Sequence, residues 1–259
     1  LLTFSVQHVH IVYTPMRPAR NVNETKTIRS IERAVDVLAC FDHETPELSV
    51  TDLQKRTDLS RPTLYRILAT LEGKGVIRSF GDPQRFVLGH EASRLAASWI
   101  GQDEFLRAAG PVLHRLWEET DETVALFVVT DDGKKICIEE LQSRQALTFK
   151  RGIGFSETLS VGASGKAMLA YTDAAANDPE FDDVRRTGVR VSRGEIIEGA
   201  VAIAAPVFNR DGSVKGSVCI FGPEVRLSDG RRDSCIEYVR EASREISSAL
   251  GYAVPTAAE

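Results

Sequence analysis

The polar and basic side chains of the segment 60–75, SRPTLYRILATLEGKG, have the chemistry needed to contact DNA bases and phosphates. Its leucines and isoleucine fall at i, i+3, i+4 and i+7, which predicts a helix with one apolar stripe. The other side chains must then lie on the outer face of that helix: Arg61, Thr63, Tyr65, Arg66 and Thr70. A solvated surface helix has the same pattern, so the flanking segments must decide between the two interpretations.

Both ends of this segment carry the signals of a helix boundary. Ser60 is a favoured N-cap residue, and Pro62 suits the first turn because the N–H that proline lacks has no partner there. Gly73 and Gly75 supply the C-terminal stop. The sequence therefore predicts a helix that begins after Ser60 and ends near Gly75.

The neighbouring segments complete a winged helix-turn-helix. Residues 49–52, SVTD, have the spacing of a capping box, and residues 57–58 predict the tight turn between two helices. Downstream, VIRSF and RFVLG flank the loop 81–84, which is typical of a two-stranded hairpin, or wing. We expect this DNA-binding domain to span residues 26–89. An earlier helix is expected to close its core with apolar residues at helical spacing: Ile31, Ala34, Val35, Leu38 and Ala39.

The charge of the whole chain argues against nucleic-acid binding, whereas the local charge argues for it. The net charge is −5 and the pI is about 5.7. Between residues 60 and 85 the balance is basic, and phosphates respond to charges within about 10 Å at moderate salt. We therefore expect these residues to contact DNA, the last of them from the wing: Ser60, Arg61, Thr63, Tyr65, Arg66 and Arg85.

Length and composition indicate a globular protein of about two domains. The chain has 259 residues, of which 42% are hydrophobic and 27% charged. No run approaches the roughly 20 apolar residues of a membrane span, and no targeting segment is evident, so we expect a cytoplasmic protein.

Leu95 and Trp99, four residues apart on a predicted linker helix, are expected to make a dimer contact. Around the DNA-binding domain we expect a disordered extension, this linker helix, a second domain and a tail: residues 1–25, 90–102, 103–252 and 253–259.

The apolar period of the second domain changes from that of helices to that of strands. Strands are predicted at 123–130, 134–141, 146–150, 200–208 and 213–221, with hairpin turns at 131–133 and 209–212. Helices are predicted at 103–120, 163–171 and 231–250. Pro111 should bend the first of these helices or begin it afresh. The whole chain is therefore expected to be α+β, with an antiparallel sheet flanked by helices after the winged helix-turn-helix.

No group of residues has the spacing of a catalytic, metal or cofactor site. Residues 162–166, GASGK, depart from a P-loop because two residues rather than four separate the glycines, and alanine follows the lysine. The four cysteines contain no CxxC pair. The candidate nucleophiles Cys137, Cys219 and Ser164 share the second domain with a single histidine, His114. We expect no enzyme activity, no metal and no cofactor.

Several segments carry a resemblance to a known family through their order and spacing: TIRSIERAVDVLACF, SVTDLQKRTDLSRPTLYRILATLEGKGVI, RFVLG at the end of the wing, LSVGASGKAMLAY and GAVAIAAPVFNRDGSVKGSVCIFGP. Across residues 27–252 the chain resembles the IclR family of bacterial transcriptional regulators. The resemblance implies a GAF-like domain that binds a small metabolite, often an organic acid. It also implies a dimer or dimer of dimers on palindromic double-stranded operator DNA. By the family pattern the effector pocket would be lined by Gly162, Ala163, Ser192, Ala202, Cys219 and Phe221.

Two of these positions depart from the family pattern and change the expected ligand. Family members that bind small polar acids tend to have a small polar residue where Ala202 and Phe221 stand. Strand alternation places small Ala202 beside large Phe221, which leaves a cavity with an aromatic wall, although Phe221 as an ordinary core residue is the alternative. We expect the protein to regulate a catabolic operon. Its effector should be an organic acid with an aromatic or other apolar body. The N–H groups of Gly162 and Ala163 should hold its acid end.

A different class of function also fits the second domain. A GAF-like domain could belong to a redox or signalling enzyme that uses Cys137 or Cys219 as a reactive thiol. The sequence leaves both classes open, together with the choice between repressor and activator.

Overall fold

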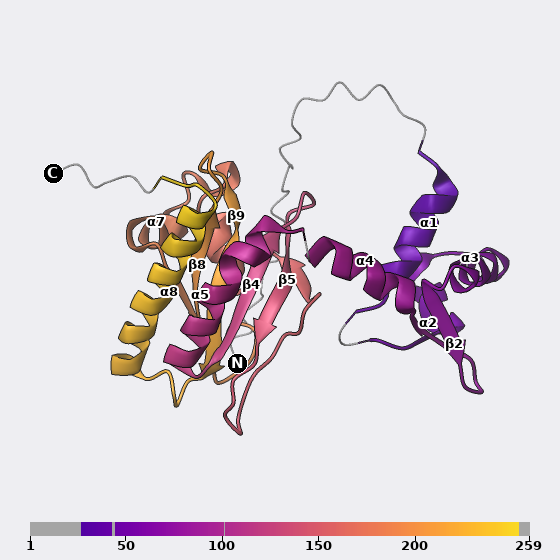
Figure 1. The fold of residues 1–259 in the computed structure, drawn as a ribbon, viewed down its shortest axis with the longest axis horizontal. Coiled ribbons are helices and arrows are strands. Elements are labelled where there is room, and N and C mark those ends of the chain that lie inside the picture. The colour runs from indigo at the N-terminus through magenta and orange to yellow at the C-terminus, as the bar shows by residue number, and fades with distance from the viewer. Residues whose placement is uncertain (1–26, 43–44, 101, 254–259) are drawn as a thin grey trace, which may run out of the picture.

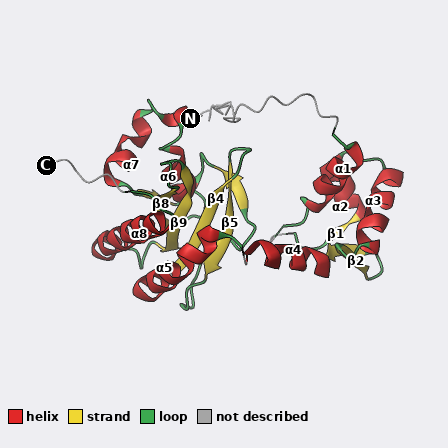
Figure 2. Cartoon of the chain, turned by 45° about the horizontal axis from the view of Figure 1, so that its top comes forward, coloured by secondary structure: helices red, strands yellow, loops and turns green. Residues whose placement is uncertain are grey.

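The computed structural model describes residues 27–42, 45–100 and 102–253. Two groups of elements stand apart, one within residues 29–88 and one within residues 104–249, and helix α4 (His90–Ile100) runs between them (Figures 1 and 2). We call the first group the winged module and the second the sensor domain. The predicted extension 1–25 and all but the first residue of the predicted tail lie outside the described residues.

The winged module is a winged helix-turn-helix, as the sequence predicts. Its elements are α1 (Arg29–Leu38), β1 (Leu48–Ser49), α2 (Val50–Thr57), α3 (Arg61–Gly73), β2 (Ile77–Phe80) and β3 (Arg85–Leu88), and β3 lies between β1 and β2. The predicted capping box is present, because the Ser49 hydroxyl accepts the Asp52 N–H at 3.2 Å and the Asp52 carboxylate accepts the Ser49 N–H at 3.0 Å. Asp58 adopts a left-handed conformation with φ 50°, which ends α2 before the turn.

Helix α1 meets the core of the winged module differently from the prediction. Ile31 and Val35 are 58% and 57% exposed, whereas Val37 is buried, followed by Cys40 and Phe41 beyond the end of the helix. The predicted stripe is wrong at Ile31, Val35 and Ala39, which are exposed, because helical spacing alone does not say which of two apolar faces meets the core. An exposed apolar surface therefore remains on α1.

Helix α4 begins at His90, where the linker helix is predicted to begin, and ends at Ile100, two residues before the predicted end at 102. Glu91 and Ala92 are half-buried, and none of its described side chains is buried. The two residues expected at a dimer contact are largely exposed, Leu95 at 56% and Trp99 at 46%. Both are therefore free in the monomer to make an interface.

The sensor domain is built on an antiparallel sheet that has six strands within the described residues, in the order β6-β5-β4-β9-β8-β7. The strands are β4 (Thr123–Val129), β5 (Lys134–Leu141), β6 (Ser156–Thr158), β7 (Arg190–Arg193), β8 (Ala200–Phe208) and β9 (Val214–Pro223). The helices are α5 (Glu104–Thr120), α6 (Gly162–Leu169), α7 (Asp182–Thr187) and α8 (Asp229–Ala249), with single 3₁₀ turns at Asp173–Ala175 and Pro179–Phe181.

Alternation along the central strands divides this sheet into two packed faces. Val218 and Ile220 of β9 pack with α5 and α8, whereas Cys219 and Phe221 face the other side, where α6 lies. The long helices α5 and α8 lie side by side across one face in both views of the chain (Figures 1 and 2). Among the described residues the second face is covered by the short α6 and by loops, which leaves room for a pocket.

Three details of the sensor domain correct the sequence prediction. Residues 146–150 do not form a strand, because their backbone is tied to the side chain of Thr123, which donates to the carbonyl oxygen of Phe149 at 2.8 Å. The short edge strands β6 and β7, which were not expected, flank the sheet instead. Helix α5 continues through Pro111 and does not begin afresh there.

Candidate functional site

The outer face of α3 presents the side chains that the sequence assigns to DNA. Arg61, Tyr65 and Arg66 are exposed, and the Arg61 guanidinium lies 5.8 Å from the centre of the Tyr65 ring. Ser60 occupies the N-cap position without a side-chain hydrogen bond to the helix backbone, contrary to the expected cap. Its hydroxyl pairs instead with that of Thr63 at 2.9 Å. These five residues therefore form one continuous polar surface at the start of α3.

The wing supplies a less available arginine than the sequence suggests. Arg85 pairs with Glu47 at 3.5 Å, and both side chains are about half exposed. Arg78 lies over the Phe80 ring at 5.9 Å. Arg85 must therefore leave or share its carboxylate partner to reach a phosphate.

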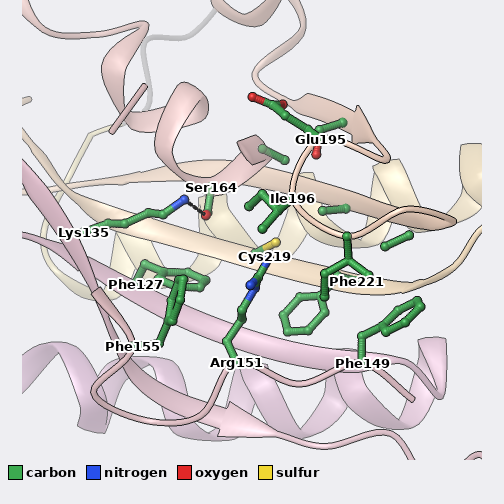
Figure 3. A pocket seen from close by; sticks show the side chains of 15 residues that line it. Phe127, Lys135, Phe149, Arg151, Phe155, Ser164, Glu195, Ile196, Cys219 and Phe221 are labelled. Atoms are coloured by element: carbon green, nitrogen blue, oxygen red, sulfur yellow. Dashed lines mark hydrogen bonds between the residues drawn. The ribbon is translucent and has the colours of Figure 1, made fainter. Parts of the chain in front are cut away.

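A cavity lies on the α6 side of the sensor sheet, where the family resemblance predicts the effector pocket (Figure 3). The register pairs Ala202 with Phe221, as strand alternation predicts. Five of the six predicted effector residues line the cavity, namely Ala163, Ser192, Ala202, Cys219 and Phe221. The sixth, Gly162, stands at the start of α6 beside the cavity, with a φ of 72° that favours glycine.

Three phenylalanines that sequence reasoning missed complete the aromatic wall: Phe127, Phe149 and Phe155. Phe127 could have been found from strand alternation, because it lies on the same face of β4 as Ala125. Phe149 and Phe155 come from an irregular segment without such a signal. The cavity is therefore more aromatic than Phe221 alone indicates.

Lys135 is a buried cation at the edge of this pocket. It is 1% exposed, and its Nζ donates to the carbonyl oxygen of Val161 at 2.6 Å and to the Ser164 hydroxyl at 3.1 Å. Glu157 lies 3.3 Å from the same nitrogen. Burial lowers the pKa of Lys135, against the opposing effect of Glu157. These partners hold the Lys135 side chain between β5 and the start of α6. Lys135 therefore stabilises the structure around the pocket.

Arg151 is a second cation in the pocket and has a different environment. Its backbone N–H donates to Glu140 at 2.8 Å, whereas its guanidinium lies 4.9 Å from the centre of the Phe155 ring. Within the described residues the guanidinium has no carboxylate partner. The side chain points towards Cys219 in the middle of the cavity (Figure 3). Its positive charge is therefore available to a ligand.

The N-terminus of α6 already holds a carboxylate from the protein. Glu195 accepts the N–H of Gly162 at 3.2 Å and pairs with Lys166 at 2.8 Å. Burial would raise the pKa of Glu195, but these two hydrogen bonds together hold it below its usual value. The N–H that the sequence assigns to a ligand's acid end thus has a partner in this structure.

The cysteine chemistry of the alternative function is disfavoured by burial. Burial raises the pKa of Cys137 to about 12 and that of Cys219 to about 12. Both thiols therefore stay protonated near neutral pH, while His114 lies on α5 beside Trp117 and not beside either of them. Lys166 pairs with Glu195 and Glu180, unlike the free lysine of a P-loop.

Other features of the described residues add no further chemistry. They contain no cluster of histidine, cysteine, aspartate or glutamate that could hold a metal ion. None of the helices among them is long and apolar enough to cross a membrane.

A winged helix-turn-helix joined by a helix to a sheet domain with a small pocket defines a class, the ligand-responsive DNA-binding regulators. Comparison with known proteins agrees with this class. Residues 30–79 match the IclR helix-turn-helix domain, and residues 98–179 and 172–248 match the bacterial transcriptional regulator IclR C-terminal domain. The chain belongs to the IclR family.

Similar proteins extend over nearly the whole chain. The HTH-type transcriptional regulator BhcR of Paracoccus denitrificans is 27% identical over 243 residues, which cover 85% of this chain and 86% of that protein. The HTH-type transcriptional regulator KdgR of Dickeya chrysanthemi is 26% identical over 264 residues, covering 93% and 86%. The crystal structure of an IclR transcriptional regulator from Alicyclobacillus acidocaldarius shares the fold, with a TM-score of 0.79, 21% identity and coverage of 87% and 100%.

These relatives are transcriptional regulators, so the chain is a ligand-responsive DNA-binding regulator and not an enzyme. Its partners are operator DNA and a small-molecule effector.

Proposed function

We propose that this regulator acts in the cytoplasm and controls a catabolic operon in response to a small organic acid with an aromatic body. The observation that carries the proposal is a pocket walled by Phe127, Phe149, Phe155 and Phe221 into which the unpaired guanidinium of Arg151 points. Aromatic walls suit an apolar ligand body, and a positive charge without a carboxylate partner makes the whole pocket favourable for an anion. A tiny, highly polar acid would leave the phenylalanines without a partner.

The orientation of the ligand follows from the positions of the polar groups. The N–H groups at the start of α6, Gly162 and Ala163, would hold the acid end, with Lys166 close by. The aromatic body would then lie among the phenylalanines, with Arg151 stacked on its face as it stacks on Phe155. The remaining predicted residues, Ser192, Ala202 and Cys219, would line its sides.

The DNA-binding role is assigned to the start of α3 and to the wing. Ser60, Arg61, Thr63, Tyr65 and Arg66 would contact operator DNA from α3, because the N-terminal residues of a recognition helix reach the base edges. Arg85 would contact a phosphate from the wing. All of these side chains except the half-buried Thr63 are exposed, which supports the assignment.

We further propose a homodimer or a dimer of dimers. One winged module buries little DNA surface, whereas two-fold symmetry doubles the contacts on a palindrome. Leu95 and Trp99 on α4 are exposed and would contribute to the interface. Light scattering at micromolar concentration should give an even-numbered oligomer. A monomer that still binds its operator tightly would contradict this.

A panel of acids screened by thermal shift tests the ligand. An acid at a hundredfold its dissociation constant should add about 2.7 kcal/mol of stability. We expect stabilisation by benzoate-like acids, a smaller effect of pyruvate, and loss of the effect in Phe221→Ser and Arg151→Gln. Lys150→Gln, which removes an exposed neighbouring charge, is the matched control.

Two outcomes would contradict the proposal. Stabilisation by pyruvate-sized acids alone would show that the aromatic wall does not select the ligand. If a gel shift detects no binding of the protein to the DNA upstream of its own gene, with or without the acid, the regulatory role of the site is contradicted.

A further inference from the structure

The loop 194–199, GEIIEG, places an acidic and an apolar side chain of the protein over the pocket. The Glu195 carboxylate occupies the N-terminus of α6 through the N–H of Gly162. Ile196 lies beside it and points towards Cys219 (Figure 3). Its Cδ1 is only 2.6 Å from the position that a Cβ on Gly162 would take. A carboxylate and an apolar group thus already occupy the place expected for an acid with an apolar body.

The space left beneath this loop is too small for such a ligand. The cavity measures about 50 Å³. Pockets for small molecules are typically roughly 300–1,000 Å³, and a single water needs about 10–15 Å³ of such space. The described conformation therefore admits a few waters, and the loop must move before an aromatic acid can enter.

The loop is held in a way that permits this movement. Gly194 and Gly199 bound it with φ of 61° and 74°, and a Cβ on either would meet nothing within 4 Å. Ile196 is 38% exposed and the Glu195 side chain 28% exposed, so both contacts are partly open to water. Partly exposed ion pairs contribute little to stability, and exposed glycines absorb changes in backbone angle easily. The backbone hydrogen bonds from Gly194 to Ala200 and from Glu224 to Gly199, both 2.8 Å, hold the two ends of the loop. Residues 195–198 can therefore move outward between these fixed ends.

We propose that the loop 194–199 is a lid whose Glu195 and Ile196 imitate the effector and determine which ligands the pocket accepts. An incoming acid replaces Glu195 at the N–H of Gly162 and beside Lys166, while its apolar body replaces Ile196 against the phenylalanines. A ligand lacking either part cannot displace both side chains. This inference rests on the proposed function of the pocket. It adds that in the ligand-free protein Glu195 and Ile196 compete with the effector for the same place.

Hydrogen exchange of the ligand-free protein provides the first test. In Glu195→Gln the carboxylate is lost, so amides in the loop 194–199 and at the start of α6 should exchange at least about fivefold faster than in the wild type. Glu198→Gln removes the same charge from the same loop and is the matched control. Equal exchange in the wild type and Glu195→Gln would overturn the lid.

Benzoate binding to the full chain provides the second test. Because the apparent dissociation constant rises as the fraction of open lid falls, Glu195→Gln should bind benzoate about five- to tenfold more tightly than the wild type. Ile196→Ala should also bind it more tightly, since the body no longer has to displace a larger side chain. Unchanged or weaker binding by both variants would overturn the role of the lid as a competitor.

The two proposals fail in different ways. If no acid of the panel binds the wild type, the effector assignment is wrong, and the exchange measurement still decides whether Glu195 holds the loop. If benzoate binds the wild type and neither variant changes its affinity or the exchange, the effector assignment stands and the lid is wrong.

Discussion

One charged site of the winged module and one of the sensor domain lie in opposite environments. Arg61 and Arg66 of the winged module are exposed, and neither has a carboxylate partner within the described residues. In the sensor domain Glu122 is fully buried, and the Arg226 guanidinium donates to its two carboxylate oxygens at 2.7 and 2.6 Å. One set of charges faces water, and the other is part of the packed structure.

The physical consequence is a division between binding and stability. Exposed charges contribute about 0–1 kcal/mol to folding, so a DNA-binding surface can carry them without affecting the fold. Removing one partner of a buried pair leaves the other charge uncompensated, which costs about 3–5 kcal/mol. Substitutions at Arg61 and Arg66 should therefore affect binding, and substitutions in the Arg226–Glu122 pair should affect stability.

The largest expected effect is on the buried pair. Arg226→Ala should lower the free energy of unfolding of the sensor domain by about 3–5 kcal/mol, because the carboxylate of Glu122 stays buried without its partner. Urea denaturation measures the change. Arg186→Ala removes an arginine from an exposed pair with Asp183 and should cost about 0–1 kcal/mol. Similar losses in the two variants would remove the contrast between buried and exposed charge.

The reverse behaviour is expected at the recognition helix. Arg61→Ala and Arg66→Ala should each cost roughly 1–3 kcal/mol of operator binding if the residue contacts a base, and leave the urea midpoint nearly unchanged. Fluorescence anisotropy with operator and scrambled DNA measures this. Arg107→Ala, an exposed arginine of α5, is the control. Unchanged operator affinity in the double variant would show that α3 does not recognise DNA.

The wing tests an intermediate case, because its arginine has an exposed partner. Arg85→Ala should lower the slope of log affinity against log salt by about one unit, since one phosphate contact is lost. Glu47→Gln removes the competing carboxylate, which lies 3.5 Å from Arg85, and should tighten binding to all sequences. If both variants keep the wild-type salt slope and affinity, Arg85 does not touch phosphate.

The smallest expected effect concerns the capping box of α2. Hydrogen bonds from the Ser49 hydroxyl and N–H lower the pKa of Asp52 below its usual value of 3.8. Because the folded-state pKa is the lower one, this stabilisation is fully present above the unfolded value and disappears as the pH falls through the folded value. Ser49→Ala should cost about 1 kcal/mol at pH 7.

The pH dependence provides the check on this cap. The difference in stability between wild type and Ser49→Ala should shrink as the pH is lowered below about 3.8. A difference that stays constant down to strong acid would mean that the carboxylate of Asp52 takes no part in the cap.

The features that the sequence predicts correctly are those set by neighbouring residues. The bounds of α3 and of the wing hairpin follow from an apolar stripe, a proline, and glycines within one short segment. The pairing of Ala202 with Phe221 follows in the same way from a hairpin and a period of two. These signals are local, so they can be recognised in the sequence without knowledge of the fold.

The features that it misses depend on contacts distant in the chain. Glu195 reaches Gly162 across 33 residues, and neither residue carries a local sign of the other. Phe149 and Arg151 enter the pocket from an irregular segment, where no period tells which way a side chain points. The face of α1 that meets the core is likewise decided by the packing of α2 and α3. Such choices are settled by tertiary packing.

The length and exposure of α4 determine how far one end of this helix moves when the other end tilts. At about 1.5 Å per residue, the helix His90–Ile100 is a rod of roughly 16 Å, and it has no buried side chain among those described that would brace it along its length. A tilt of about 10° at its sensor end moves the other end by roughly 3 Å, close to the rise of one base pair in a half-site spacing of about 34–36 Å per 10–10.5 base pairs. A tilt of this size therefore corresponds to a shift of about one base pair along the operator.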